Sequence, residues 1–216
     1  MSSNFSAKLP GDTLIAGKKT VNDWIAFRPK LVPGGEASEW RAGFKDYFHA
    51  RLSSRYLKPI EKLQKIGLRQ GEGFSIVAIQ CSLIEFLEST LQGTSYRYRC
   101  KGDPPLGPYE YSDSGRIFKS FLAHRTPFDA EFSPQLADDF YVNVRCGVLH
   151  EARTKNGWTV SAKSKSGNVI DANRNVVYRD DFQTALLKFV DWYETALPSD
   201  KAFQEALIRK FDSLCV

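Results

Sequence analysis

The sequence predicts a mainly helical domain with one small β-insertion ahead of its C-terminal helices. Over most of the 216 residues, apolar side chains recur every three or four positions, which is the period of an amphipathic helix. Residues 158–178 instead show short alternating or β-branched runs separated by turn residues, which is typical of strands. With 42% apolar and 25% charged residues, the chain can bury a sizeable core.

Residues 1–35 are expected to form an irregular N-terminal segment, and residues 36–216 the helical domain. Proline and glycine interrupt the first segment repeatedly, and only residues 24–27 offer an apolar anchor. The first helix follows Gly35 and is expected to bend or restart at Pro59. Residues 73–92 are the most apolar part of the chain and predict a central helix.

The second half of the chain alternates between helix signals and turn signals. The expected elements are a short helix at 113–124, a helix from Ser133-Pro134 to about Thr154, a hairpin or meander at 158–178, a helix at 181–197 and a last helix capped by Ser199. The β-insertion therefore lies between the long helix and the two C-terminal helices.

Charge and composition exclude several classes of protein. The 30 Lys and Arg against 25 Asp and Glu give a net charge of +5, which permits a nucleic-acid partner without demanding one. The four cysteines and three histidines have no metal-ligand spacing, so we expect no metal, no cofactor and no disulfide framework. No apolar run approaches membrane-spanning length, and residues 1–8 lack the apolar core of a secretory signal. We therefore expect a cytoplasmic protein with no membrane partner.

The residues most able to carry chemistry are Arg145 and His150, close together late in a predicted helix. Histidine can move a proton near neutral pH, and arginine can hold a phosphate and the charge that develops on it. Such a pair could cleave RNA without a metal, because the RNA 2′-hydroxyl is itself the nucleophile. Two supporting residues are considered: Glu85, which could orient Arg145 or a histidine, and Asn143, which could bind phosphate.

Each of these residues also has a structural interpretation. Arg145 could be a surface arginine, and His150 a hydrogen-bonded histidine at a helix end. Glu85 could belong to an ordinary polar stripe, and Asn143 could be a surface asparagine. Cys146 lies four residues before His150 and forms a rival pair, but nucleophilic cysteines favour helix N-termini, where the dipole lowers the thiol pKa.

The spacing of Arg145, four residues and His150 resembles the signature of the HEPN superfamily (higher eukaryotes and prokaryotes nucleotide-binding domains). The flanking residues 145–153, Arg-Cys-Gly-Val-Leu-His-Glu-Ala-Arg, resemble a bacterial branch of it. The resemblance implies a HEPN-like helical bundle that acts as a metal-independent endoribonuclease in a toxin–antitoxin or phage-defence setting, with an antitoxin or defence protein as a possible partner. The expected products are 2′,3′-cyclic phosphate and 5′-hydroxyl ends.

The resemblance leaves an alternative open. The family often has Asn, Asp or His directly after the arginine, whereas this chain has Cys146. That departure favours a catalytically inactive module that binds RNA, a nucleotide or a partner protein. A structural or adaptor protein without a ligand is a third interpretation.

The spacing also bears on the oligomeric state. Positions five apart lie about 140° apart around an ideal helix, so Arg145 and His150 cannot converge tightly on one straight helix. The resemblance implies another arrangement, because HEPN domains commonly dimerise and place two such motifs across a shared cleft. We therefore expect a homodimer with the helix of residues 133–154 at or near the interface.

Positive charge is concentrated near the proposed site. Residues 145–179 contain seven basic residues and two acidic ones, a difference of +5 that equals the net charge of the whole chain. The residues expected to contact RNA are Arg153, Lys155, Lys163, Lys165 and Arg174. The alternative is a solvated hairpin whose lysines limit edge-to-edge pairing.

A second basic segment lies apart from this one. Residues 96–101, Tyr-Arg-Tyr-Arg-Cys-Lys, mix aromatic and basic side chains in a composition that suits base stacking and phosphate contact. The same composition is also compatible with a solvated helix end.

Overall fold

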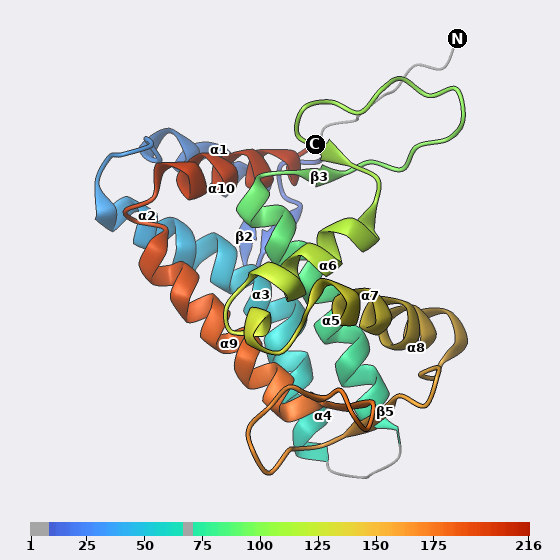
Figure 1. Ribbon diagram of the computed structural model, residues 1–216. Helices are drawn as coiled ribbons and strands as arrows, with labels where there is room; N and C mark the ends of the chain where they lie inside the picture. Colours follow the sequence, from blue (N-terminus) through green and yellow to red (C-terminus); the bar gives the residue numbers. More distant parts are fainter. Residues whose placement is uncertain (1–8, 67–70) are drawn as a thin grey trace. The chain divides into compact units, whose positions relative to one another are not determined.

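The computed structural model describes residues 9–66 and 71–216, and helix predominates in it, at 61% against 8% strand (Figure 1). This confirms the mainly helical class. The chain divides into two compact units: Met1–Leu57, Ser89–Ser112 and Glu194–Val216 form the first, and Lys58–Glu88 and Asp113–Tyr193 form the second. This division differs from the expected one at residue 35, because two long helices, α5 (Glu72–Gln92) and α9 (Arg179–Ala196), supply residues to both units.

The N-terminal segment is not irregular, which corrects the expectation for residues 9–35. Its elements are β1 (Leu14–Ala16), β2 (Lys19–Thr20), α1 (Val21–Phe27) and a 3₁₀ turn (Arg28–Lys30). A capping box begins α1: Thr20 Oγ1 accepts from the Asp23 N–H, and the Asp23 carboxylate accepts from the Thr20 N–H. Trp24 then anchors the helix, because its ring is buried against Tyr47 and Phe211.

One unbroken helical stretch follows, in which α-helix alternates with π-helix. Its segments are α2 (Ala37–Gly43), a π-helix (Phe44–His49), α3 (Ala50–Leu52), a second π-helix (Ser53–Leu57) and α4 (Lys58–Ile66). The stretch continues through Pro59, where a bend or restart was expected, and the change from π-helix to α-helix falls at Lys58, one residue before the proline.

The first unit is completed by β3 (Ser95–Tyr96), β4 (Glu110–Tyr111) and α10 (Lys201–Ser213). The cap of α10 is Asp200 and not Ser199, because Asp200 Oδ1 accepts the N–H groups of Ala202 and Phe203. A carboxylate at this position also complements the helix dipole.

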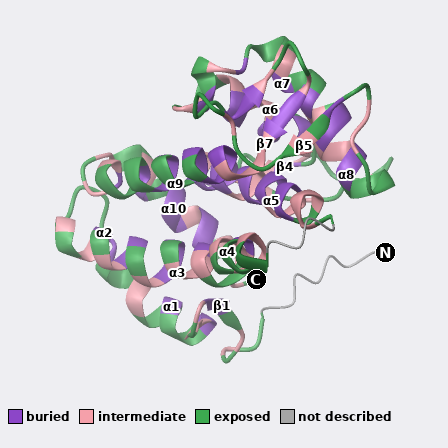
Figure 2. Cartoon of the chain, turned by 90° about the horizontal axis from the view of Figure 1, so that it is seen from below, coloured by how far each residue is buried: buried purple, intermediate pink, exposed green. Residues whose placement is uncertain are grey.

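The second unit contains α4 and residues 72–88 of α5. Its other elements are α6 (Ser114–His124), a 3₁₀ turn (Phe128–Ala130), α7 (Pro134–Phe140), a π-helix (Tyr141–Arg145), α8 (Cys146–Glu151), β5 (Thr159–Ser161), β6 (Ile170–Asp171), β7 (Val176–Tyr178) and α9. Phe121, Phe128, Phe140 and Phe182 are buried edge-on or tilted against their neighbours and form its aromatic core. Figure 2 shows buried residues in purple along α6, α7 and β7 of this unit.

The central helix α5 is long and apolar enough to cross a membrane by length and composition, contrary to the expectation that no segment would be. However, 67% of its most apolar window is buried inside the protein. That burial is typical of a core helix. Even polar side chains of this helix lie inside the protein: Ser89 and Glu88 are fully buried and hydrogen-bonded.

The β-insertion is a three-stranded sheet in the order β5-β7-β6. The β6–β7 pair is antiparallel and confirms a hairpin, but β5 pairs with β7 in parallel, so the segment is not a meander. Trp158 fixes the start of the insertion, since it is buried edge-on against Phe140 and its Nε1 donates to Asp139 at 2.7 Å. This contact with α7 fixes the residue that directly precedes β5.

Candidate functional site

Arg145 and His150 lie on one helical stretch in which α7, the π-helix and α8 follow one another without a break. Its start agrees with the sequence: Ser133 Oγ accepts from the Leu136 N–H at 3.1 Å, and Pro134 occupies the first helical position. Its end does not, because α8 stops at Glu151 and not near Thr154. Ala152 adopts a left-handed conformation, with φ of 54°, and terminates the helix.

Arg145 is the last residue of the π-helix, and two groups hold its side chain. Its Nη2 lies 3.8 Å from Oε2 of Glu85 on α5, and its guanidinium lies 5.3 Å from the centre of the Tyr141 ring. The Arg145 side chain is 17% exposed as a result. The structure therefore brings together Arg145 and Glu85, as the sequence suggested, and adds Tyr141, which the sequence reasoning missed.

His150 lies in the last turn of α8 with its side chain exposed. Within residues 9–66 and 71–216, no hydrogen bond or ion pair engages its ring, and none joins it to Arg145. This follows from the five-residue spacing: Arg145 faces α5 while His150 faces solvent, about 140° further round an ideal helix. The ring is thus available to a ligand or to another protein chain.

Asn143 has a structural role in this arrangement and is not the surface asparagine considered above. It is buried, its Nδ2 donates to Asp139 at 2.7 Å, and its Oδ1 accepts from Asn156 at 3.0 Å. Its backbone carbonyl also accepts from the Lys155 N–H. These bonds fold the segment after α8 back against the helix, and both ends of the Asn143 amide have a partner within the chain.

Gly147 allows that segment to pass close to the helix. A Cβ at this position would lie 2.5 Å from the carbonyl oxygen of Arg153, far inside normal contact distance. The glycine lies between the two motif residues, Arg145 and His150. Its role is close backbone approach.

The two cysteines near Arg145 differ in exposure. Cys81 on α5 is buried, and burial raises the pKa of its thiol to about 12, with nearby Arg145 opposing this only weakly. Such a thiol is protonated and inert at neutral pH. Cys146 is partly exposed but lies in mid-helix, far from the N-terminus at Ser133, where the dipole would favour a thiolate.

The five predicted RNA-binding cations fall into two groups. Arg153 and Lys155 both pair with Glu151, and the Lys155 hydrogen bond is the main cause of the lowered Glu151 pKa. Because one carboxylate faces two cations, this group carries less free charge than the sequence count suggests. These residues line an open hollow of about 590 Å³ beside Trp158.

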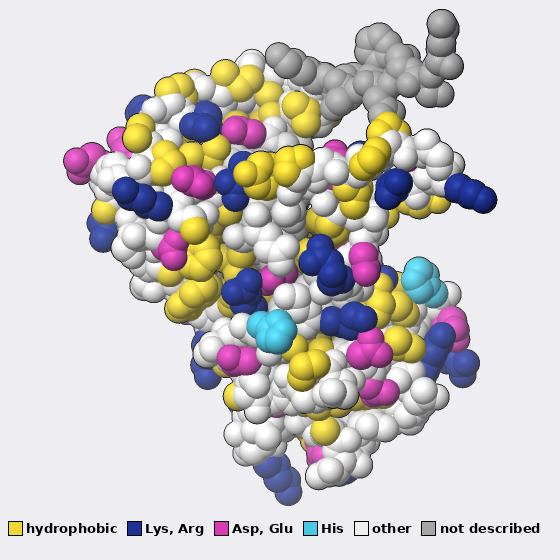
Figure 3. All heavy atoms as spheres, turned by 45° about the horizontal axis from the view of Figure 1, so that its top comes forward, with side chains coloured by type: hydrophobic (Ala, Val, Ile, Leu, Met, Phe, Trp, Pro, Cys, Tyr) yellow, Lys and Arg dark blue, Asp and Glu magenta, His cyan; other side chains and the backbone are white. Residues whose placement is uncertain are grey.

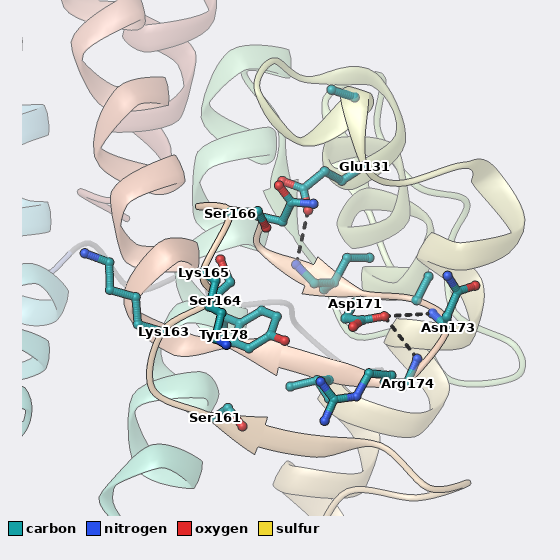
Figure 4. Close-up of a pocket in the computed structure, with 15 residues that line it drawn as sticks. Glu131, Ser161, Lys163, Ser164, Lys165, Ser166, Asp171, Asn173, Arg174 and Tyr178 are labelled. Carbon is teal, nitrogen blue, oxygen red and sulfur yellow. Dashed lines mark hydrogen bonds between the residues drawn. The ribbon is translucent and has the colours of Figure 1, made fainter.

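The other three cations, Lys163, Lys165 and Arg174, line a larger hollow of about 740 Å³ over the β-insertion (Figure 4). Hydroxyl groups of serines and Tyr178 also line it. The acidic residues of this hollow are Asp171 and Glu131. Glu131 was not foreseen because it lies before α7, outside residues 145–179, over which the charges were counted. The Glu131 carboxylate accepts the N–H groups of Val169 and Ile170 at 3.0 and 3.1 Å, so it fixes β6.

Two exposed apolar side chains flank the motif. Val142 is 47% exposed and Leu149 is 42% exposed, and they lie on either side of Arg145 in the chain, Val142 in the π-helix and Leu149 in α8. Both stand outside the apolar positions that recur every four residues from Leu136, of which Phe140, Val144 and Val148 are buried, and this departure was the signal available in the sequence. Exposed apolar residues next to His150 are the kind of surface that a second chain covers.

No group of three or more His, Cys, Asp or Glu side chains suited to a metal ion occurs among the described residues. Comparison with protein-family models, with curated proteins and with solved structures yields no match. The chemistry of the site itself is therefore the basis for a functional proposal.

Proposed function

We propose that this chain is a metal-independent endoribonuclease of the HEPN type. The observation that carries the proposal is the arrangement at the end of the α7–α8 stretch: Arg145 is positioned by Glu85 and Tyr141, and His150 is exposed five residues later without a partner among the described residues. A positioned cation and an available imidazole are the two groups that phosphodiester transfer through the 2′-hydroxyl requires.

In the proposed reaction, His150 acts as the general base and takes the proton of the RNA 2′-hydroxyl. The 2′-oxygen forms a bond to phosphorus, and the bond from phosphorus to the 5′-oxygen breaks. Arg145 binds the non-bridging phosphate oxygens and stabilises the charge of the phosphorane. Water supplies the proton that the leaving 5′-oxygen takes up, and the protonated His150 then returns its proton to water, so the products are a 2′,3′-cyclic phosphate and a 5′-hydroxyl.

We propose that the active form is a homodimer in which the α7–α8 stretches of two chains meet. Arg145 and His150 point in different directions within one chain, and the exposed Val142 and Leu149 lie beside them. A two-fold interface on this face would bring Arg145 of one chain toward His150 of the other. The setting we propose is defence or toxin–antitoxin, with a regulatory protein partner.

The direct test is incubation of the pure protein with total RNA in excess EDTA, with the ends of the products analysed. We expect cleavage that leaves cyclic phosphate and 5′-hydroxyl ends and that is lost in His150→Ala. Cleavage that EDTA abolishes would overturn the metal-independent mechanism.

An RNA- or nucleotide-binding module without activity is the second candidate. It is favoured by the pairing of Arg145 with Glu85, which leaves the arginine only 17% exposed in the single chain. The same incubation separates the two functions: the module would retain RNA on a filter and release it intact.

Replacing Cys146 by alanine is expected to leave most of the cleavage activity in place, and iodoacetamide is expected to inhibit the wild type slowly. The thiol lies in the middle of the helical stretch beside a glycine, away from the N-terminal end, where the helix dipole would favour a thiolate. The measurement is the initial rate of RNA cleavage with and without the reagent. Rapid, stoichiometric inactivation by iodoacetamide would instead support a cysteine nucleophile.

The hollow over the β-insertion is expected to contact the RNA backbone. In a His150→Ala background, changing Lys163, Lys165 and Arg174 to alanine should weaken binding of every sequence and flatten the salt slope by about 0.7 per lost contact with a single strand. The measurement is anisotropy of a labelled RNA against salt concentration. A matched control changes Lys18, Lys62 and Lys188 to alanine, which removes the same charge elsewhere. An unchanged slope in the first triple variant would show that the hollow does not bind RNA.

A further inference from the structure

The aromatic and basic segment at residues 96–101 is not a helix end. Ser95 and Tyr96 form strand β3, which pairs in parallel with β4 so that Ser95 lies opposite Glu110 and Tyr96 lies opposite Tyr111. Two further backbone bonds extend the pairing: the Ser95 N–H donates to Tyr109, and the Arg97 N–H donates to Tyr111. The loop that joins the two strands therefore begins and ends at neighbouring positions of the first unit.

The register sorts side chains onto two faces. Because side chains alternate along a strand, Tyr96 and Tyr98 project on one side of the ladder and Arg97 on the other. Tyr111 shares the side of Tyr96, since the two residues are directly paired, and Tyr109 lies in the turn that leads into β4. Their rings confirm this, with Tyr96 and Tyr111 in edge contact at 5.6 Å between centroids.

Arg97, on the opposite face, holds the loop in shape. Its Nε donates to Glu110 at 2.7 Å, and its Nη2 donates to the carbonyls of Pro104 and Pro105 at 3.1 and 2.7 Å. Hydrogen bonds from Gly107 and Arg97 lower the pKa of the Glu110 carboxyl, which keeps this pair ionised. The loop is therefore held together by its own hydrogen bonds and ion pair, although it is exposed to solvent.

The tyrosine face is left open to solvent. Tyr98 is 73% exposed, and Tyr96 and Tyr109 are each 51% exposed, whereas Tyr111 is buried beneath them. Figure 3 shows yellow and dark blue side chains gathered on the arm at its upper right. A protein rarely exposes three neighbouring aromatic rings unless they bind something.

Cations surround these rings. Arg99 and Lys101 are exposed in the loop, and the Arg209 guanidinium lies 4.4 Å from the centre of the Tyr109 ring. Aromatic rings that alternate with cations match the chemistry of a single nucleic-acid strand, in which flat bases alternate with phosphates. A protein partner would not require this alternation.

We propose that the tyrosine face, formed by Tyr96, Tyr98 and Tyr109, is a stacking surface for unpaired bases of single-stranded RNA. Arg99 and Lys101 contact the phosphates of the same strand. The choice of RNA over DNA rests on the proposed function, but the stacking surface acts in binding and takes no part in cleavage.

The test is a binding measurement in the His150→Ala background with a fluorescein-labelled, 2′-O-methyl uridine dodecamer. Tyr98→Ala is expected to weaken binding by about 5- to 150-fold, the usual loss for one base stacked on an aromatic ring. Tyr98→Phe keeps the ring and should bind within about twofold of the parent. Ile25→Ala removes an exposed apolar side chain of the same unit and should have no effect.

A strand with the same backbone and no bases makes the test specific. Stacking predicts that Tyr98→Ala costs nothing on this abasic strand, while Arg99→Ala with Lys101→Ala still flattens the salt slope by about 1.4. Unchanged affinity of Tyr98→Ala for the base-bearing strand, or an equal loss on the abasic strand, would overturn the proposal. Base-dependent binding by a wild-type protein that cuts no RNA would support this surface while refuting the proposed ribonuclease.

Discussion

Replacing His150 by alanine is expected to slow RNA cleavage by about 10²–10⁴-fold, the usual cost of losing a positioned proton-transfer group. The fold should be unaffected, because the side chain is exposed and has no partner among the residues that the structure describes. Initial rates on a defined RNA in EDTA measure the first effect, and the midpoint of thermal unfolding measures the second.

His124→Ala is the matched control for this variant. His124 is also exposed, and it ends another helix, α6, of the same unit. We expect its cleavage rate to equal that of the wild type. Equal rates for His150→Ala and the wild type would contradict the proposed role of the imidazole.

Substitutions at Arg145 test the proposed binding of the phosphate and stabilisation of the phosphorane. Arg145→Lys keeps the charge but loses the planar fork that holds two phosphate oxygens, so we expect a clear fall in rate with RNA binding largely retained. Arg145→Ala should lose more, and it also removes the ion pair with Glu85. Combining Arg145→Ala with Glu85→Gln separates lost chemistry from the loss of that ion pair, because the double variant should unfold like the wild type yet remain inactive.

The helical class was predictable because it follows from the local periodicity of apolar side chains. The helix that bears the motif shows this well: Ser133-Pro134 marked its start, and apolar residues every fourth position marked its buried face. Such signals depend on neighbours within a few residues. Its end was harder to predict, because Glu151 is the last helical residue for a reason that lies outside the helix, the return of the chain over Gly147.

The N-terminal segment shows the limit of local reasoning. Thr20 and Asp23 have the spacing of a capping box, but the helix they begin is stable only because Trp24 packs on Tyr47 and Phe211, and the last of these is near the opposite end of the chain. Likewise, no local pattern shows that β5 joins β7 in parallel. Long-range pairing of this kind is invisible in a window of ten residues.

The candidate site was likewise predictable only in the parts that depend on local sequence. Arg145 and His150 were found from their types and spacing, and Glu85 from its place on the central helix. What could not be found was the environment: the burial of Asn143, the Glu151 carboxylate that engages Arg153 and Lys155, and the Glu131 carboxylate in the basic hollow. Each comes from a contact between segments that no sequence pattern connects.

Mixed dimers provide the strongest test of the proposed assembly. If Arg145 of one chain acts with His150 of the other, a dimer of one Arg145→Ala chain and one His150→Ala chain contains one intact site and one doubly damaged site. Two affinity tags on co-expressed chains allow this mixed dimer to be purified. We expect about half of the wild-type rate, although each homodimer is inactive.

A site built within one chain predicts a different result, because neither chain of that mixed dimer would then carry both residues and the rate would be negligible. A mixed dimer of wild-type and His150→Ala chains serves as the control, since it has one intact site in either arrangement. Inactivity of the first mixed dimer beside half activity of the second would refute the shared site.

The face that should form this dimer can be tested separately. Leu149→Asp places a charge among the exposed apolar residues of α8, and burying that charge at an interface is costly, so we expect a monomer that has lost cleavage activity. Leu187→Asp makes the same change at an equally exposed leucine on α9 and should leave both the dimer and the activity intact. Light scattering at micromolar concentration reports the mass of each variant. A fully active monomer, whether wild type or Leu149→Asp, would show that the Arg145 and His150 chemistry is completed within a single chain.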